Sequence, residues 1–231
     1  MTPTPETIFF ALSGGILPAL LWLWFWLKED RLHPEPRGMI IRTFFAGIVA
    51  VPLVLPLEKI IQNNYAADAL LVVFLWACSE EIFKWIAAAL AAFDTKEYDE
   101  PIDAVIYMIT AALGFSAMEN VFFLVTSISQ TSIADSLVTG NLRFIGATLL
   151  HVLSSGTIGF FMGMSFYKGW FVKKMSLALG IAAAIVLHTV FNLYIMKSEG
   201  TGIFIVFCFV WLAILLLIAG FEKIKKIKSM R

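Results

Sequence analysis

The chain has 231 residues, of which 60% are hydrophobic and 15% are charged, and its formal net charge is zero. A soluble domain has roughly 45–50% apolar and roughly 25% charged residues, so this composition excludes a single water-soluble core and a soluble nucleic-acid-binding role. Apolar stretches of about 20 residues recur between short polar breaks, and that length crosses ~30 Å of hydrocarbon. The sequence therefore predicts an all-α, polytopic transmembrane helical bundle of about seven helices, with residues 1–231 forming one domain.

In chain order, the predicted spans are residues 6–27, 40–61, 67–93, 101–126, 142–166, 175–196 and 201–222. The first span follows a segment without basic residues and ends in three tryptophans that suit a membrane interface, so we expect it to be retained and not cleaved. The two cysteines, Cys78 and Cys208, lie far apart in the sequence. They predict neither a disulfide scaffold nor a thiolate zinc site.

The placement of lysine and arginine predicts the orientation of the bundle. Thirteen of these residues fall in the first, third and fifth connections and the C-terminal tail, whereas the opposite side holds three: Lys59, Arg143 and Lys197. Because basic residues accumulate on the cytosolic side, we expect a multi-pass protein of the cell membrane with an extracytosolic N-terminus and a cytosolic C-terminus.

The third span carries adjacent carboxylates, Glu80 and Glu81, followed by Lys84. Each charge at mid-bilayer costs about 2.5–3.5 kcal/mol, so these groups must face protein or water. Lys84 is placed to pair with either carboxylate, at i,i+4 or at i,i+3. Adjacent side chains diverge by about 100° around a helix, so one carboxylate can be paired while its neighbour faces a cavity.

Further polar side chains lie in the next three spans: Glu119, Asn120, His151, His188 and Asn192. Measured along each helix from its predicted extracytosolic end, Glu80 lies ~20 Å deep, and Glu119, His151 and His188 lie at ~11, ~14 and ~12 Å. Helices that alternate in direction have no reason to share such a depth unless the groups face one another. The sequence therefore predicts one shared polar site.

This site is chemically suited to peptide hydrolysis, which needs a general base and donors for the developing oxyanion. Glu80 is the candidate base, and His188 with Asn192 are the candidate donors. The alternative is a zinc-dependent protease that uses four competent ligands: Glu80, Glu119, His151 and His188. No His-Glu-x-x-His signature is present, so our first expectation is a site without a metal or other cofactor.

An ordered series of motifs resembles the PrsW family of bacterial membrane proteases, distant relatives of the CAAX prenyl endopeptidases. The motifs are Asp30-Arg-Leu-His-Pro-Glu35-Pro36, Glu80-Glu81-x-x-Lys84, Tyr98-Asp-Glu-Pro-Ile-Asp103-Ala-Val-Ile-Tyr107, Gly114-Phe115-x-x-x-Glu119-Asn120, His151 and His188-x-x-x-Asn192. Glu-Glu-x-x-Lys alone is a weak signal, whereas the ordered series is fairly specific.

The resemblance implies cleavage of a single-span membrane protein, such as an anti-sigma factor, near its extracytosolic face in a stress response. It implies that Glu80 activates water, that Glu81 pairs with Lys84, and that His188 and Asn192 stabilise the oxyanion. Glu119 stands where the CAAX endopeptidases carry histidine, so it is expected either to orient the water or to protonate the leaving amine. Phe115, Asn120 and His151 complete the expected set.

Two interpretations without proteolysis use the same groups. Intramembrane glutamates and histidines often form proton or ion relays in transporters. The absence of a visible repeat argues against that class, because many transporters contain inverted repeats. The other interpretation is a scaffold of the CAAX-like type that has kept its polar core without the activity.

Overall fold

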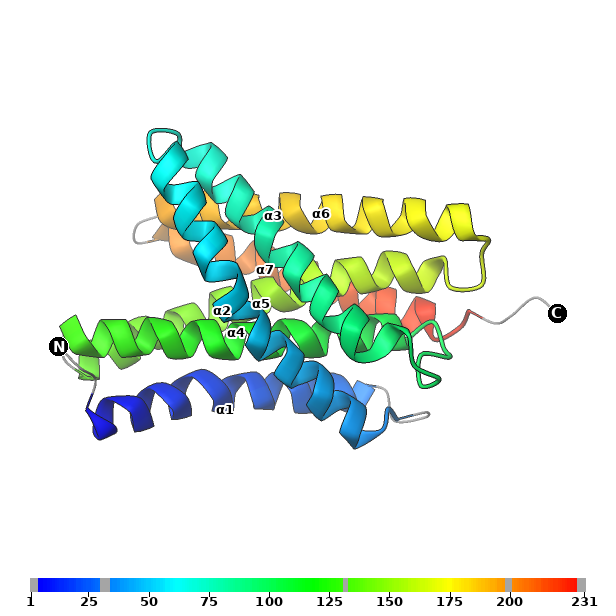
Figure 1. The fold of residues 1–231 in the computed structure, drawn as a ribbon, viewed down its shortest axis with the longest axis horizontal. Coiled ribbons are helices and arrows are strands. Elements are labelled where there is room, and N and C mark those ends of the chain that lie inside the picture. Colours follow the sequence, from blue (N-terminus) through cyan, green and yellow to red (C-terminus); the bar gives the residue numbers. More distant parts are fainter. Residues whose placement is uncertain (1–3, 30–33, 131–132, 198–200, 228–231) are drawn as a thin grey trace.

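A computed structural model describes residues 4–29, 34–130, 133–197 and 201–227 of the protein, and each predicted span is a helix in it (Figure 1). The helices are α1 (Pro5–Glu29), α2 (Arg37–Tyr65), α3 (Ala69–Ala88), α4 (Asp103–Gln130), α5 (Ile133–Met164), α6 (Trp170–Lys197) and α7 (Thr201–Ile224), and a short π-helix, η1 (Ala89–Phe93), follows α3. Among the described residues no strand occurs. The prediction of an all-α membrane bundle is confirmed.

Six of the described helices are long and apolar enough to cross a membrane, and α3 is the exception. Its 20 residues include the three charges of Glu80, Glu81 and Lys84, so its composition is not that of a lipid-facing helix. Helix α5 begins at Ile133 and not near residue 142. The first turns of α5 contain three polar residues, Asp135, Asn141 and Arg143, which lower their hydropathy. A prediction based on apolar length therefore places the start of this helix too late.

Helices α4 and α5 form the centre of the bundle. In the apolar part of α4, 72% of the residues are buried, and the share in α5 is 67%, against 22% in α1. Helices α2 and α3 form a hairpin that crosses the other helices at an incline (Figure 1). This crossing places α3 over α4 and α6, so its charges face other helices of the bundle.

Two glycines allow α2 and α4 to pack backbone against backbone. A Cβ atom on Gly47 would lie 2.0 Å from the carbonyl oxygen of Ala111, and one on Gly114 would lie 2.0 Å from that of Phe44. Because only glycine lacks this atom, the close approach requires glycine at both positions. Gly114 belongs to the motif that carries Phe115 and Glu119, so the contact sets the position of those side chains on α4.

Two further motif segments meet at the end of the bundle where α2 and α4 begin. The hydroxyl of the fully buried Tyr107 hydrogen bonds to the carboxylate of Glu35. Asp103 is also buried, and its Oδ2 accepts hydrogen bonds from the backbone N–H groups of Asp99 at 2.9 Å and Glu100 at 2.7 Å. These contacts fix the segment that enters α4. Asp30 and His33 of the first motif lie outside the described residues.

Candidate active site

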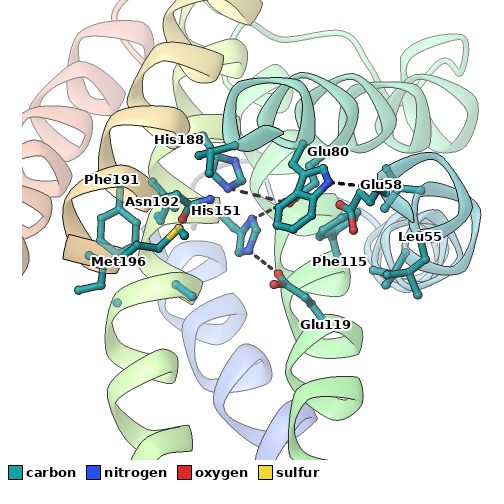
Figure 2. A pocket seen from close by; sticks show the side chains of 18 of the residues that line it. Leu55, Glu58, Glu80, Phe115, Glu119, His151, His188, Phe191, Asn192 and Met196 are labelled. Carbon is teal, nitrogen blue, oxygen red and sulfur yellow. Dashed lines mark hydrogen bonds and ion pairs between the residues drawn. The ribbon is translucent and has the colours of Figure 1, made fainter. Parts of the chain in front are cut away.

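The predicted polar groups surround a pocket of about 390 Å³ that is lined by residues of α2 to α7 (Figure 2). We call it the polar pocket, and its ionisable and amide side chains are Glu58, Glu80, Glu119, His151, His188 and Asn192. The four residues whose predicted depths were similar, Glu80, Glu119, His151 and His188, come from α3, α4, α5 and α6 and meet in this pocket. The rest of the wall is mostly apolar, including Phe115 and Phe191.

The two adjacent glutamates of α3 have different surroundings. Lys84 Nζ lies 2.5 Å from Glu81 Oε1 and 3.9 Å from Glu80 Oε2. Helical spacing permits either pair, and the structure makes Glu81 the closer partner. Glu81 and Lys84 have no exposed surface, whereas Glu80 lines the polar pocket.

The carboxylate of Glu81 is held by four side chains. Besides Lys84, the hydroxyls of Ser154 and Ser155 donate to it at 2.8 and 3.0 Å, and His188 Nδ1 lies 2.8 Å from Oε1. A buried charge is tolerated only when it is paired and hydrogen-bonded, and this one is both. Glu81 is therefore an anchor between α3, α5 and α6, with its oxygens already in use.

These contacts assign the protons of the two histidines. An ionised carboxylate only accepts, so His188 Nδ1 carries a hydrogen toward Glu81, and in the neutral ring Nε2 is the acceptor. Lys84 Nζ lies 2.9 Å from His151 Nδ1, so that nitrogen accepts from the ammonium. His151 Nε2 then donates to Glu119 Oε2 at 2.8 Å. The two rings meet edge to face, with centroids 5.3 Å apart.

Glu80 points an oxygen at these acceptors. Its Oε2 atom is buried without a hydrogen-bond partner among the described residues. The same atom lies 3.8 Å from His188 Nε2 and 3.9 Å from His151 Nδ1. Acceptors that face one another in this way repel unless a cation or a hydrogen lies near them, and the Lys84 ammonium lies 2.9 Å from His151 Nδ1 and 3.9 Å from Glu80 Oε2.

A metal ion fits this arrangement of donors. Glu80, His151 and His188 each offer one ligand atom, and these atoms all lie within 4.8 Å of one another. A carboxylate with two imidazoles is a suitable ligand set for zinc, and the hydrogen bond from His188 to Glu81 is the support that metal-bound histidines usually have. Glu119, the fourth ligand of the zinc hypothesis, is not in this group; it hydrogen bonds to His151 instead.

The remaining predicted residues divide into two groups. Asn192 and Phe115 line the polar pocket, and the Phe115 ring centroid lies 5.0 Å from Lys84 Nζ. Asn120 does not line it: this buried side chain donates to Thr148 Oγ1 at 3.2 Å, and so joins α4 to α5 away from the pocket. Its motif position reflects helix packing.

The sequence reasoning missed Glu58 of α2, which lines the polar pocket beside Glu80 (Figure 2). It also missed Ser154 and assigned no contact to Ser155. A signal for Glu58 existed, since it is an acidic residue inside a predicted span. Its position next to Lys59, three residues before the predicted end of the span, made it look like an ordinary polar flank.

An apolar groove adjoins the polar pocket. Its volume is about 430 Å³, its floor is formed by α5, and its walls are formed by α6 and α7. Leu150 and Phe191 line both cavities, so the groove and the polar pocket are neighbours that share these two side chains. An apolar cavity therefore lies next to the carboxylates and histidines.

Comparison with known proteins gives a consistent set of relatives. A family model described as "PrsW family intramembrane metalloprotease" matches residues 35–218. The chain is 29% identical over 203 residues to Protease PrsW of Geobacillus kaustophilus, with 84% of each chain covered. It is 24% identical over 224 residues to Protease PrsW of Bacillus subtilis, with 96% of this chain and 97% of that protein covered. No solved structure matches.

Proposed function

The chain belongs to the PrsW family of intramembrane metalloproteases, and we propose on this premise that it cleaves a single-span membrane protein near the extracytosolic face of the cell membrane. Membership in the family makes it a membrane-embedded peptidase with several spanning helices. The observation that carries the proposal is the polar pocket, in which carboxylates and histidines from five helices meet inside an apolar bundle. Neither a transporter nor a scaffold without activity accounts for the family assignment.

The proposed substrate is an anti-sigma factor or a similar single-span protein whose cleavage starts a stress response. The motif resemblance supports this class of substrate. The groove between α6 and α7 supports a membrane-embedded substrate, because its apolar walls suit a lipid-facing segment and it shares Leu150 and Phe191 with the polar pocket.

We propose zinc as the cofactor, held by Glu80, His151 and His188. The support is the convergence of three donors, the buried oxygen of Glu80 that has no hydrogen-bond partner among the described residues, and the family description as metalloproteases. When bound, zinc would supply a water of lowered pKa and would polarise the scissile carbonyl. The zinc proposal replaces our first expectation, a site without metal. The family assignment does not support that first expectation, because it describes metalloproteases.

The side chains of the protein have separate proposed roles. Glu81 keeps His188 in one tautomer, with its Nε2 directed into the polar pocket. Glu119 accepts the Nε2 hydrogen of His151 and borders the pocket, which suits it to exchange a proton with water or with the leaving amine. Asn192 is one helical turn from His188 and offers an amide donor for the carbonyl oxygen of the substrate.

A metal-free mechanism is the second candidate, and one contact favours it. Lys84 Nζ lies 2.9 Å from His151 Nδ1, the nitrogen that faces Glu80. A metal ion could bind this nitrogen only after the contact with Lys84 had opened. If the contact persists during turnover, Glu80 is the general base that activates water, and His188 with Asn192 stabilises the oxyanion.

The proposed orientation places the N-terminus outside the cytosol and the C-terminus inside. Its support is the excess of lysine and arginine in the connections on one side of the bundle. Reporter fusions that are active on only one side of the membrane test it at each connection. Cytosolic activity of a reporter joined at residue 66, between α2 and α3, would contradict this orientation.

Comparison of membrane proteomes tests the proposed function. Cells that produce the wild-type chain are compared with cells that lack the gene, and new protein N-termini are identified by mass spectrometry. We expect at least one single-span membrane protein to be shortened near its extracytosolic end only when the chain is present. Identical membrane proteins in the two strains, under conditions in which the chain is produced and inserted, would contradict the proposal.

A further inference from the structure

Three buried polar side chains join α4 to α5 beside the polar pocket, and the mechanism does not use them. Thr148 Oγ1 accepts a hydrogen bond from Ser116 Oγ at 3.0 Å and another from Asn120 Nδ2 at 3.2 Å. Ser116 and Thr148 have no exposed surface, and Asn120 is also buried. A hydroxyl oxygen accepts two hydrogen bonds, so the two α4 residues use the full acceptor capacity of Thr148. We call these three residues the threonine clamp.

The threonine clamp lies about one helical turn from a contact inside the polar pocket. His151 follows Thr148 by three residues on α5, and Glu119 follows Ser116 by three residues on α4. Residues at this spacing share a helix face. Glu119 Oε2 lies 2.8 Å from His151 Nε2, and Figure 2 shows this contact in the pocket. The same two helix faces are therefore joined twice, once by the clamp and once in the pocket.

The packing of α5 against α4 differs between the two halves of α5. In the C-terminal half the backbones are in contact, since a Cβ atom on Gly159 would lie 2.6 Å from the carbonyl oxygen of Ala104. Close to the threonine clamp, Gly146 faces α7 instead, because a Cβ atom there would lie 2.5 Å from the ring of Phe207. Near the polar pocket, hydrogen bonds of the clamp thus fix the two helices where a glycine contact does so farther along.

We infer that Thr148 is a positioning residue, whose hydroxyl fixes α5 against α4 and thereby keeps Glu119 and His151 in contact. The inference rests on the proposed function, because it makes the position of these two side chains matter for activity. It holds with and without a metal, since Glu119 borders the polar pocket in both candidate mechanisms. It also explains a motif residue that does not line the pocket: Asn120 is a donor of the clamp.

Two substitutions of Thr148 separate the hydroxyl from the packing of the side chain. Thr148→Val keeps the shape but removes the acceptor, which leaves two buried donors without this partner. Thr148→Ser keeps the hydroxyl and loses one methyl group. Thr157→Val is the matched control on the same helix, because Thr157 does not line the polar pocket and its hydroxyl donates to the carbonyl oxygen of Leu153 within α5 at 2.7 Å.

The variants are compared for kcat and KM on the single-span protein found in the proteome comparison, and for zinc affinity by competition with a fluorescent chelator. We expect Thr148→Val to lower kcat and zinc affinity by about 10- to 100-fold with little change in KM. Thr148→Ser should recover most of both losses, and Thr157→Val should match the wild type. Thermal unfolding in detergent reports whether each variant is folded.

A second substitution tests the route from Thr148 to the polar pocket. Glu119→Leu removes the acceptor that faces His151, so the clamp no longer has this contact to position. We therefore expect Thr148→Val to lower zinc affinity in the wild-type background and to add little to the loss in Glu119→Leu, because residues that act through one contact are not additive. Equal losses in the two backgrounds would show that the hydroxyl acts only through general stability.

Histidine ring signals test the position of His151 without zinc or substrate. The chain has three histidines, so selective ¹⁵N labelling gives a simple spectrum. The signals of His151 are identified as those that change in Glu119→Leu. We expect the same signals to change in Thr148→Val and to stay in place in Thr148→Ser and Thr157→Val.

A folded Thr148→Val with wild-type kcat, zinc affinity and His151 signals would overturn the role of Thr148. If Thr148→Val does not fold, Ser116→Ala takes its place, because it removes one hydrogen bond of the clamp and leaves no donor behind. Unchanged His151 signals in Ser116→Ala would then overturn the inference. A wild-type chain that neither cleaves a membrane protein nor binds zinc would instead contradict the proposed function, and the histidine signals would still decide on Thr148.

Discussion

Nδ1 of His188 lies 2.8 Å from Oε1 of Glu81, although the two residues are 107 positions apart in the chain. This contact joins α3 to α6 and fixes which nitrogen of His188 carries the hydrogen. Its Nε2 is then the acceptor that faces Glu80 Oε2 at 3.8 Å. Glu81 thus acts on the polar pocket through His188, while its neighbour Glu80 faces the pocket directly.

Replacement of Glu80 by glutamine should abolish cleavage without unfolding the protein. The change keeps the size of the side chain but removes both its basicity and its charge, and we expect kcat to fall by about 10²- to 10⁴-fold. Cleavage of the single-span substrate is measured beside thermal unfolding in detergent. Glu222→Gln, at an exposed carboxylate of α7 outside the pocket, is the control and should behave as the wild type. Full cleavage by Glu80→Gln would exclude both proposed roles of Glu80.

Replacement of Glu81 by leucine should act on stability. Lys84 would remain buried without its closest counter-charge, which typically costs about 3–5 kcal/mol. The double substitution Glu81→Leu with Lys84→Met should recover much of this loss, since it removes the whole ion pair. Unfolding of both variants in detergent measures the difference. A single variant as stable as the wild type would show that Glu81 is not an anchor of the bundle.

Metal analysis should find about one zinc ion per chain in protein purified without chelators. Removal of zinc should stop cleavage, and its return should restore it. His188→Ala should lose the metal, whereas Cys208→Ser, at an exposed thiol of α7, should retain it. Cleavage by protein shown to be free of metal would favour the mechanism in which Glu80 alone activates water.

Substitution of Gly47 by alanine should separate α2 from α4. The added Cβ atom would lie 2.0 Å from the carbonyl oxygen of Ala111, so the helices must move apart, at a cost of about 1–3 kcal/mol. Gly38→Ala is the matched control on the same helix, because its Cβ atom would meet nothing within 4 Å. Equal unfolding temperatures for the two variants would show that the close contact is not needed.

Removal of the Tyr107 hydroxyl tests the contact between the first and third motifs. Tyr107→Phe leaves Glu35 without this donor, and we expect a loss of about 1–3 kcal/mol in the free energy of unfolding. The control is Tyr65→Phe, since Tyr65 is 47% exposed and lies at the other end of α2. A loss of kcat in a fully stable Tyr107→Phe would assign the contact a role in activity instead.

The helices could be predicted because the physics behind them is local. An apolar stretch of sufficient length must form a helix in a bilayer, and charges such as Glu80 and Lys84 must then face protein. Comparison of depths between spans was enough to bring Glu119, His151 and His188 into one layer. None of this required knowledge of which helices are neighbours.

The details of the site depend on neighbours and could not be predicted. Helical spacing allows Lys84 to pair with Glu80 or with Glu81, and the choice follows from Ser154 and Ser155 on α5, which complete the surroundings of Glu81. Glu58 was missed for a similar reason: only the incline of the α2–α3 hairpin brings it to Glu80. The motif also could not show that Asn120 bonds to Thr148 and lies outside the lining of the polar pocket.

The contact between Lys84 and His151 has a consequence for the assembly of the protein. With Lys84 at 2.5 Å from Glu81, the chain carries a balanced pair of charges into the bilayer, and the helices can associate before any metal ion is available. A metal ion that bound His151 Nδ1, as proposed, would have to displace the Lys84 ammonium group, which lies 2.9 Å from that nitrogen. Metal loading is then an exchange of cations, and weakly binding metal ions should fail to complete it.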